Sequence, residues 1–246
     1  FDEQADYFLL DVSHPAFVNR DGAQESLLSD IAQDPTVGLI ASRDGYLLLQ
    51  QGAPRHPTVP EFFTFAYADP PQRATPVNAT FGEELQLVAF ETQRDYADRE
   101  AEPLITLYWQ VLTPPAEDYF IAVFLLDESG KPVGVTRFQQ PLTVWWPTSR
   151  WETGRTVRLL ANTFSWWTGD RRHFGYGVSV VRGKEPGSAS LAEPWDVTAR
   201  LPVTRHDGGP ASLDDGTLLP LVKFKRIAGI PYQVKARAPR ELEDGP

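Results

Sequence analysis

The sequence contains no cysteine and no methionine among its 246 residues, and it has only four histidines. Without cysteine the chain has no disulfide bond, no thiolate metal ligand and no cysteine nucleophile. The histidines are scattered and lack the spacing of metal ligands: His14, His56, His173 and His206. The sequence therefore predicts no metal site. It leaves the compartment open, because exported domains with a core of this size fold without disulfides.

Long apolar runs and the common catalytic motifs are also missing. No apolar run approaches the roughly 20 residues of a membrane helix, and no signal peptide is visible at Phe1. Neither the Gly-x-Ser-x-Gly pattern of hydrolases nor a glycine-rich phosphate loop occurs. The sequence thus predicts no catalytic residue and no cofactor. The lack of methionine, in a sequence that begins at Phe1, favours a fragment of a longer polypeptide.

Basic residues are in the minority, 23 against 33 acidic ones, and the formal net charge is -10. A field of this sign repels phosphate backbones, so we expect no nucleic-acid partner. One basic group alternates with apolar residues near the C-terminus: Lys223, Lys225, Arg226, Lys235, Arg237 and Arg240. We interpret it as the solvated face of a late strand. Contact with lipid headgroups or an anionic ligand is the alternative.

The first quarter of the chain predicts a small α/β subdomain over residues 1–55. The run Tyr7–Val12 is typical of a buried strand. A helix is predicted at Ala23–Gln33, where Asp21 is placed to cap it. Two strands, Val37–Ala41 and Tyr46–Gln50, should then form a hairpin, because Asp-Gly between two apolar runs is a strong turn signal.

The remaining chain predicts a mainly β fold. Residues 56–79 form a proline-rich connector with one expected strand at Phe62–Tyr67. Short apolar runs separated by turns then indicate further strands, at 85–90, 104–111, 119–127, 133–138, 156–164, 176–181, 197–203 and 218–224. We therefore predict a jelly-roll-like β-sandwich over residues 80–235, followed by a tail at 236–246.

Two sets of segments resemble soluble regions of bacterial polytopic membrane proteins. The first set is Tyr7–Val12, a short helix and Gly38–Leu49. It is similar to the domain that follows the membrane region in an uncharacterised family of predicted membrane proteins. The other set resembles a β-sandwich module commonly appended to such proteins: Leu104–Gln110, Tyr119–Asp127, and Pro147–Trp151 with Gly154. These proteins resemble membrane-embedded glycosyltransferases that use lipid-linked sugars.

The resemblance implies a place and an attachment. The chain is expected at the extracytoplasmic face of the bacterial cytoplasmic membrane, as the C-terminal region of a membrane-anchored protein. Its implied partners are its own transmembrane region and a glycan or lipid-linked sugar. Neither set of segments contains the acidic residues that such transferases place in loops beside their first membrane spans. No catalytic residue is therefore carried over.

Tryptophan is the strongest positive feature, since five of the seven fall between Trp145 and Trp167. Adjacent residues on a strand face opposite sides, so one ring of each doublet can reach solvent and stack on a sugar. The predicted glycan site consists of both doublets and three neighbours that supply hydrogen bonds: Trp145, Trp146, Trp166, Trp167, Asp170, Arg171 and Arg172. Alternatively these rings fill the sandwich core or rest against the membrane interface. Trp109 and Trp151 are interpreted as structural.

Carboxylates offer a weaker signal. A glycoside hydrolase would need two of them close together, and the candidates are Asp118, Asp127, Glu128, Asp170, Asp214 and Asp215. Most stand in turns, where Asp is favoured for local hydrogen bonding. Two acidic turns, at 127–130 and 214–216, are alternatives for calcium, although neither matches a full calcium loop.

Three functional hypotheses follow. The first is a noncatalytic extracytoplasmic module that helps a glycosyltransferase-like membrane protein to position a glycan or acceptor. The second is a structural interaction domain that packs on its own membrane region or on a partner subunit. Its mark would be a contiguous exposed apolar patch without a polar-lined groove. The third is a glycan-active enzyme, which requires two carboxylates converging in a pocket.

Overall fold

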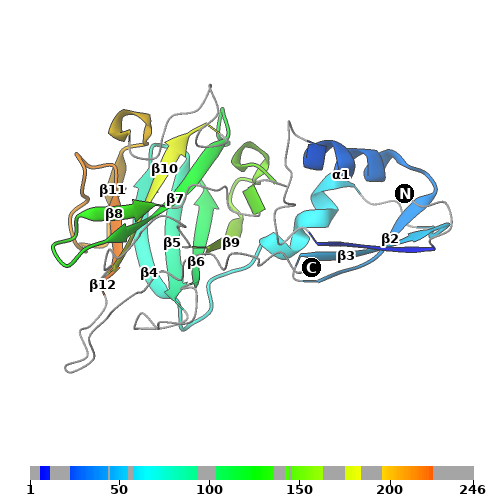
Figure 1. The fold of residues 1–246 in the computed structure, drawn as a ribbon, viewed down its shortest axis with the longest axis horizontal. Coiled ribbons are helices and arrows are strands. Elements are labelled where there is room, and N and C mark those ends of the chain that lie inside the picture. The colour runs from blue at the N-terminus through cyan, green and yellow to red at the C-terminus, as the bar shows by residue number, and fades with distance from the viewer. Residues whose placement is uncertain are drawn as a thin grey trace, which may run out of the picture.

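The computed structural model describes residues 6–11, 23–43, 45–54, 58–92, 104–135, 142–143, 146–162, 175–183 and 196–223. These residues form a mainly β structure of three antiparallel sheets (Figure 1), as the sequence predicts. Among them no helix combines the length and the apolar character needed to cross a membrane. The predicted helix cap Asp21, the basic residues after Lys223 and the tail at 236–246 lie outside the described residues.

The N-terminal part is a three-stranded sheet with a helix over one face (Figure 1). Its elements are β1 (Tyr7–Asp11), α1 (Ala23–Gln33), β2 (Val37–Arg43) and β3 (Tyr46–Gln51), and the strand order is β1-β3-β2. Leu28 and Ile31 of α1 are buried, as are Leu47 and Leu49 of β3. The predicted order of strand, helix and hairpin is confirmed, and the helix has the predicted bounds.

The next element differs from the prediction. Where the sequence predicts a strand at Phe62–Tyr67, the chain forms a 3-10 helix, η1 (Val59–Ala66). The Thr58 backbone N–H donates to the Glu61 carboxylate at 2.8 Å, and the Thr58 hydroxyl donates to the same carboxylate oxygen at 3.1 Å. Pro60 fits this position because the first turn of a helix needs no N–H donor. These local hydrogen bonds outweigh the strand preference of the aromatic run.

Two larger sheets pack face to face to make the sandwich (Figure 1). The four-stranded sheet has the order β12-β10-β7-β8, with β7 (Tyr119–Leu126), β8 (Pro132–Val135), β10 (Gly175–Arg182) and β12 (Leu219–Lys223). The five-stranded sheet has the order β11-β4-β5-β6-β9, with β4 (Thr75–Phe81), β5 (Leu85–Thr92), β6 (Leu104–Val111), β9 (Thr156–Asn162) and β11 (Val203–Arg205).

Two strands of the sandwich differ from the prediction. β4 is not predicted at all, because Pro76 favours a connector at this point of the sequence. Pro76 lies where the register between β4 and β5 shifts, and bulges are among the few places in a sheet that accept proline. The predicted strand at 197–203 is wrong over most of its length, because the chain forms a 3-10 turn, η3 (Val197–Ala199), and β11 begins only at Val203. The Asp196 carboxylate caps this turn by accepting from the Thr198 N–H at 2.9 Å.

β7 is buried on both faces, which explains its uninterrupted apolar sequence. Ile121 and Val123 face the core between the two sheets. Phe120 and Phe124 face the other way, into a second cluster that includes Ala199 and Leu218. Residues on either side of β11, in η3 and in the turn before β12, therefore cover the outer face of the four-stranded sheet.

Candidate functional site

The face of the N-terminal sheet that α1 does not cover is apolar. Side chains alternate along a strand, so Leu47 and Leu49 point to the core and their neighbours point away. In the β1–β3 register Tyr7 stands opposite Gln50, Leu9 opposite Leu48 and Asp11 opposite Tyr46. A bulge in β2 places Ile40 beside Ala41, across from Leu48. We call this surface the open face and define it by Tyr7, Leu9, Ile40, Tyr46 and Leu48.

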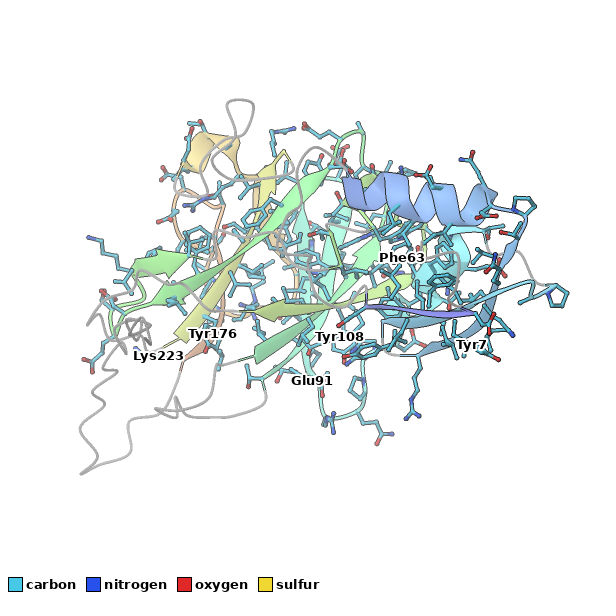
Figure 2. The ribbon with its side chains drawn as sticks, turned by 45° about the vertical axis from the view of Figure 1, so that its right-hand side comes forward. Tyr7, Phe63, Glu91, Tyr108, Tyr176 and Lys223 are labelled. Carbon is cyan, nitrogen blue, oxygen red and sulfur yellow. The ribbon has the colours of Figure 1, made fainter. Side chains whose placement is uncertain are left out.

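The open face holds most of the exposed apolar bulk of the described residues. Six large hydrophobic side chains of the described residues are well exposed. Four of them belong to the open face: Tyr7 at 59%, Leu9 at 70%, Ile40 at 45% and Tyr46 at 45%. The other two, Leu112 and Leu160, belong to the sandwich. Tyr7 lies at the opposite end of the molecule from Lys223 (Figure 2). Neighbouring positions in register make the open face a contiguous patch.

The ends of the open face are polar. At one end Tyr46 stands between Asp11 of β1 and Arg43 of β2. At the other end the Gln50 side-chain amide donates to the Tyr7 hydroxyl at 3.1 Å. An apolar centre with a polar rim is the usual anatomy of a protein interface. The sequence does not predict this exposed apolar face, because the run Tyr7–Val12 is typical of a buried strand. The signal that could have indicated it is that residues on both faces of β1 and β3 are apolar.

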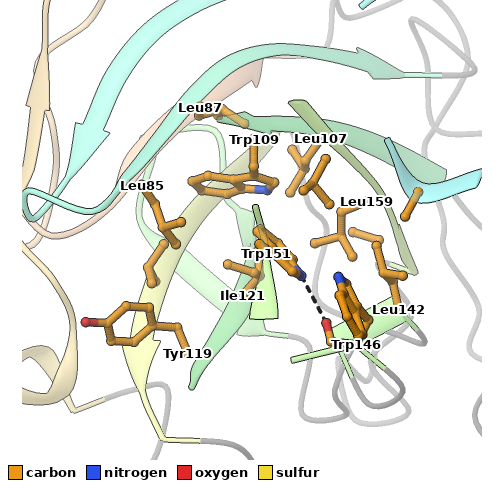
Figure 3. Packing of buried hydrophobic residues seen from close by; sticks show 14 of the residues in the cluster. Leu85, Leu87, Leu107, Trp109, Tyr119, Ile121, Leu142, Trp146, Trp151 and Leu159 are labelled. Atoms are coloured by element: carbon orange, nitrogen blue, oxygen red, sulfur yellow. Dashed lines mark hydrogen bonds between the residues drawn. The ribbon is translucent and has the colours of Figure 1, made fainter. Parts of the chain in front are cut away.

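Trp146 is part of the core. Its ring is 4% exposed and stacks on Phe63 of η1, with 4.7 Å between the ring centroids and 17° between the planes. Its indole N–H donates to the Tyr67 hydroxyl at 3.3 Å. Its backbone carbonyl accepts the indole N–H of Trp151 at 2.9 Å, and Figure 3 shows Trp151 between Trp109 and Trp146. Trp109 and Trp151 are buried, as predicted.

These contacts remove Trp146 from the stacking surface of the predicted glycan site. Trp146 is its one member among the described residues, and this ring stacks on Phe63 instead of offering a face to a ligand. The Trp146 ring points into the core, and a helical turn, not a strand, directs it there, since the Trp146 N–H donates to the Leu142 carbonyl at 2.7 Å. The other members lie outside the described residues: Trp145, Trp166, Trp167, Asp170, Arg171 and Arg172.

The outer face of the five-stranded sheet carries a polar cluster. The Glu91 carboxylate accepts from the Tyr108 hydroxyl and from the Arg73 guanidinium, both at 2.6 Å, and Glu91 and Tyr108 are close together in Figure 2. These two hydrogen bonds lower the pKa of Glu91, whereas burial and the carboxylate raise the pKa of Tyr108 to about 12. Neither group changes protonation near neutral pH, so the cluster suits a structural role better than acid–base chemistry.

Three of the described carboxylates of the catalytic and calcium hypotheses, Asp118, Asp127 and Asp214, are engaged in local structure. Asp127 accepts from the backbone N–H groups of Ser129 and Lys131 at 2.8 and 2.9 Å, which closes the turn between β7 and β8. Asp214 pairs with the buried Arg200 at 2.8 Å. Within the described part of the chain no three His, Asp or Glu side chains are grouped to hold a metal ion.

No family model, no curated protein and no solved structure matches this chain. Among the described residues, the open face is the surface on which most of the well-exposed large apolar side chains gather.

Proposed function

We propose that the chain is a noncatalytic module of a larger membrane protein, and that it docks its open face on the membrane-embedded part of the same polypeptide. One observation carries this proposal: four of the six well-exposed large apolar side chains of the described residues share the open face. Contiguous apolar patches of this kind mark interaction sites on soluble domains. Such a patch is the expected mark of an interaction domain.

The chemistry of the open face fits such a partner. None of its five residues is charged, although the whole chain has a net charge of -10. Tyr7 and Tyr46 are amphipathic, and such rings are favoured where protein meets the membrane–water interface. Burying an exposed Leu or Ile side chain contributes about 1.5–3 kcal/mol, so Leu9 and Ile40 alone supply a substantial driving force.

The extracytoplasmic location and the glycosyltransferase-like character of the larger protein belong to the same proposal. They are supported by the resemblance of the N-terminal segments to the domain that follows a membrane region. The docking proposal also gives the N-terminal sheet a role, because an apolar face left in water is an aggregation liability.

Site-specific photo-crosslinking tests the docking proposal. The complete gene product would carry benzoylphenylalanine in place of Ile40 in its own membrane. A matched control would carry it in place of Leu160, which is exposed to a similar extent on the sandwich, at 44%. We expect position 40 to crosslink to a membrane-spanning peptide of the same polypeptide and position 160 not to. Equal yields, or no crosslink from position 40, would refute the proposal.

Glycan binding remains a prediction of the sequence. Its remaining residues are Trp145, Trp166, Trp167, Asp170, Arg171 and Arg172, and chemical-shift titration with oligosaccharides tests them. Binding that disappears in Trp167→Ala but persists in Trp146→Phe would support a site built on the second doublet. Saturating sugar without any shift would remove the hypothesis.

A further inference from the structure

The outer face of the five-stranded sheet carries an uncharged polar row. Strand register places five side chains in one line, one from each strand: Thr204, Thr80, Gln86, Gln110 and Thr156. We call these five residues the polar row. Neighbouring strands lie about 4.8 Å apart, so a row that crosses five strands is about 19 Å long.

The polar row points away from the core. Its members alternate along their strands with buried residues of the core between the two sheets: Val203, Ala79, Phe81, Leu85, Leu87, Trp109, Val111 and Val157. Thr204 is exposed and the other four members are partly exposed. The four-stranded sheet differs, because an apolar cluster covers its outer face. The polar row is therefore a hydrogen-bonding surface on the outside of the sandwich.

Two hydrogen bonds hold side chains of the polar row in place. The Gln86 side-chain N–H donates to the Asn78 side-chain carbonyl at 2.7 Å, and the Thr80 hydroxyl lies 3.1 Å from a ring nitrogen of His206. The first bond orients both amides, so that the carbonyl oxygen of Gln86 and the NH2 group of Asn78 form an acceptor and a donor side by side. Asn78 and His206 are themselves exposed. Polar groups that are oriented before binding lose less conformational entropy when a ligand arrives.

We propose that the polar row binds a neutral, linear oligosaccharide that lies across the strands. Each hydroxyl group of a sugar donates one hydrogen bond and accepts others, and the amides and hydroxyls of the row offer both functions. No member of the row is charged, so a neutral chain leaves no charge unpaired on either side.

The spacing of the polar row also fits such a chain. A sugar ring with its linking oxygen is about as long as the distance between neighbouring strands, so successive rings can each meet one member of the row. This inference goes beyond the docking proposal and does not depend on it, because the polar row and the open face belong to different sheets.

Calorimetric titration of the 246-residue chain tests the proposal. The probes are cellohexaose, maltohexaose and chitohexaose, the disaccharide of each, and hexagalacturonate as a charged counterpart. We expect at least one neutral hexasaccharide to bind, and its disaccharide to bind at least about tenfold more weakly because it reaches only part of the row. A chain that binds none of the three hexasaccharides, or that binds hexagalacturonate more tightly, would overturn the proposal.

A glutamine substitution locates the bound sugar. Gln110→Ala removes one amide of the polar row and should weaken binding about three- to tenfold, which is the effect of one lost hydrogen bond. Gln51→Ala, at an exposed glutamine at the end of β3, is the matched control and should leave the affinity unchanged. Urea unfolding verifies that both variants are folded. Equal affinities of the two variants would contradict the proposal.

Nuclear magnetic resonance provides a readout that needs no variant. The side-chain NH2 signals of Gln86 and Gln110 should shift when the hexasaccharide is added, whereas shifts confined to other residues would place the sugar elsewhere. Binding that disappears in Trp167→Ala but persists in Gln110→Ala would assign the sugar to the second tryptophan doublet and overturn this proposal. None of these outcomes changes the Ile40 crosslinking result, so the two proposals fail separately.

Discussion

Single side chains connect the N-terminal part of the molecule to the sandwich. Trp146 stacks on Phe63, and the Tyr67 hydroxyl accepts both the Trp146 indole N–H at 3.3 Å and the Glu152 backbone N–H at 3.2 Å. The Arg155 guanidinium lies over the Tyr67 ring, 3.7 Å from its centroid. The joint is thus made of aromatic surface with its polar atoms satisfied, which is the arrangement that favours a fixed geometry.

Replacement of Trp146 should therefore cost stability. We expect Trp146→Ala to lower the free energy of unfolding by about 3–5 kcal/mol, because it leaves a large cavity against Phe63. Trp146→Phe keeps a stacking ring and should cost less. Urea unfolding measures both. Leu160→Ala, a truncation at an exposed site, should stay within about 0.5 kcal/mol of the unmodified chain, and an equally small loss in Trp146→Ala would contradict the assigned packing.

A second residue-scale prediction concerns acid stability. Ionic hydrogen bonds from Arg205, with a further one from the Gly209 N–H, lower the pKa of Asp207 to about 2. A carboxyl group whose pKa is depressed by folding stabilises the protein above its ordinary pKa near 3.8, and this contribution is lost as pH falls toward 2. In melting experiments Asp207→Asn should be less stable than the unmodified chain at pH 6, and the difference should shrink between about pH 4 and pH 2. A difference that is constant with pH would exclude this origin.

The resemblance to a β-sandwich module predicts some of these roles. It implies that Trp109 and Trp151 belong to the framework, and both are buried. The stacking of Trp146 on Phe63 was not predictable in the same way, because its partner comes from a segment interpreted as a strand. Long-range aromatic pairs depend on the path of the chain, which residue types do not encode locally.

At the scale of elements, prediction succeeded where periodicity and turn chemistry agreed. The helix Ala23–Gln33 and the strand Leu104–Val111 have the predicted bounds. It failed at η1 and β4, where proline and a capping hydrogen bond compete with apolar composition. Composition predicts a strand at the aromatic run beside Pro60, where the chain forms a 3-10 helix. It predicts no strand around Pro76, where β4 forms. In each case the local backbone hydrogen bonds determine the element.

The pairing of β10 with β12 depends on a glycine. A Cβ atom at Gly175 would lie 2.3 Å from the Val222 carbonyl oxygen, which is backbone and cannot swing away. We expect Gly175→Ala to push β12 from its partner and to lower the free energy of unfolding by about 1–3 kcal/mol, as overpacking does. Urea unfolding would show the loss, and exchange of the Val222 amide should quicken. Leu112→Ala, at an exposed site, is the control; equal stability of the two variants would argue against the close approach.

For the whole molecule, one hydrophobic core extends through both parts. Leu28, Phe63 and Trp109 belong to a single cluster of buried residues, with η1 between the N-terminal sheet and the sandwich. The sequence predicts the layers but assigns residues 56–79 to a connector. That Phe62 and Phe63 join the core was not predictable, because burial of a connecting segment is a property of the assembled fold.

A shared core predicts cooperative unfolding. We expect the described structure to melt in one transition, with tryptophan fluorescence and far-ultraviolet circular dichroism reporting the same midpoint. The buried rings of Trp109, Trp146 and Trp151 report on the sandwich, whereas α1 contributes its helical signal from the N-terminal part. Two separated midpoints would show that the N-terminal sheet unfolds alone and that the Trp146 joint is weak.

The position of β11 and β12 has a consequence for synthesis on the ribosome. β11 borders β4 in one sheet, and β12 borders β10 in the other. The His206 ring and the Thr80 hydroxyl, 3.1 Å apart, are separated by 126 residues of chain. A nascent chain that has not yet released residue 203 therefore exposes β4 and β10 as unpaired edges, and the outer face of β7 lacks its cover. These edges are protected from pairing with another molecule only when β11 and β12 have been translated and have paired with β4 and β10.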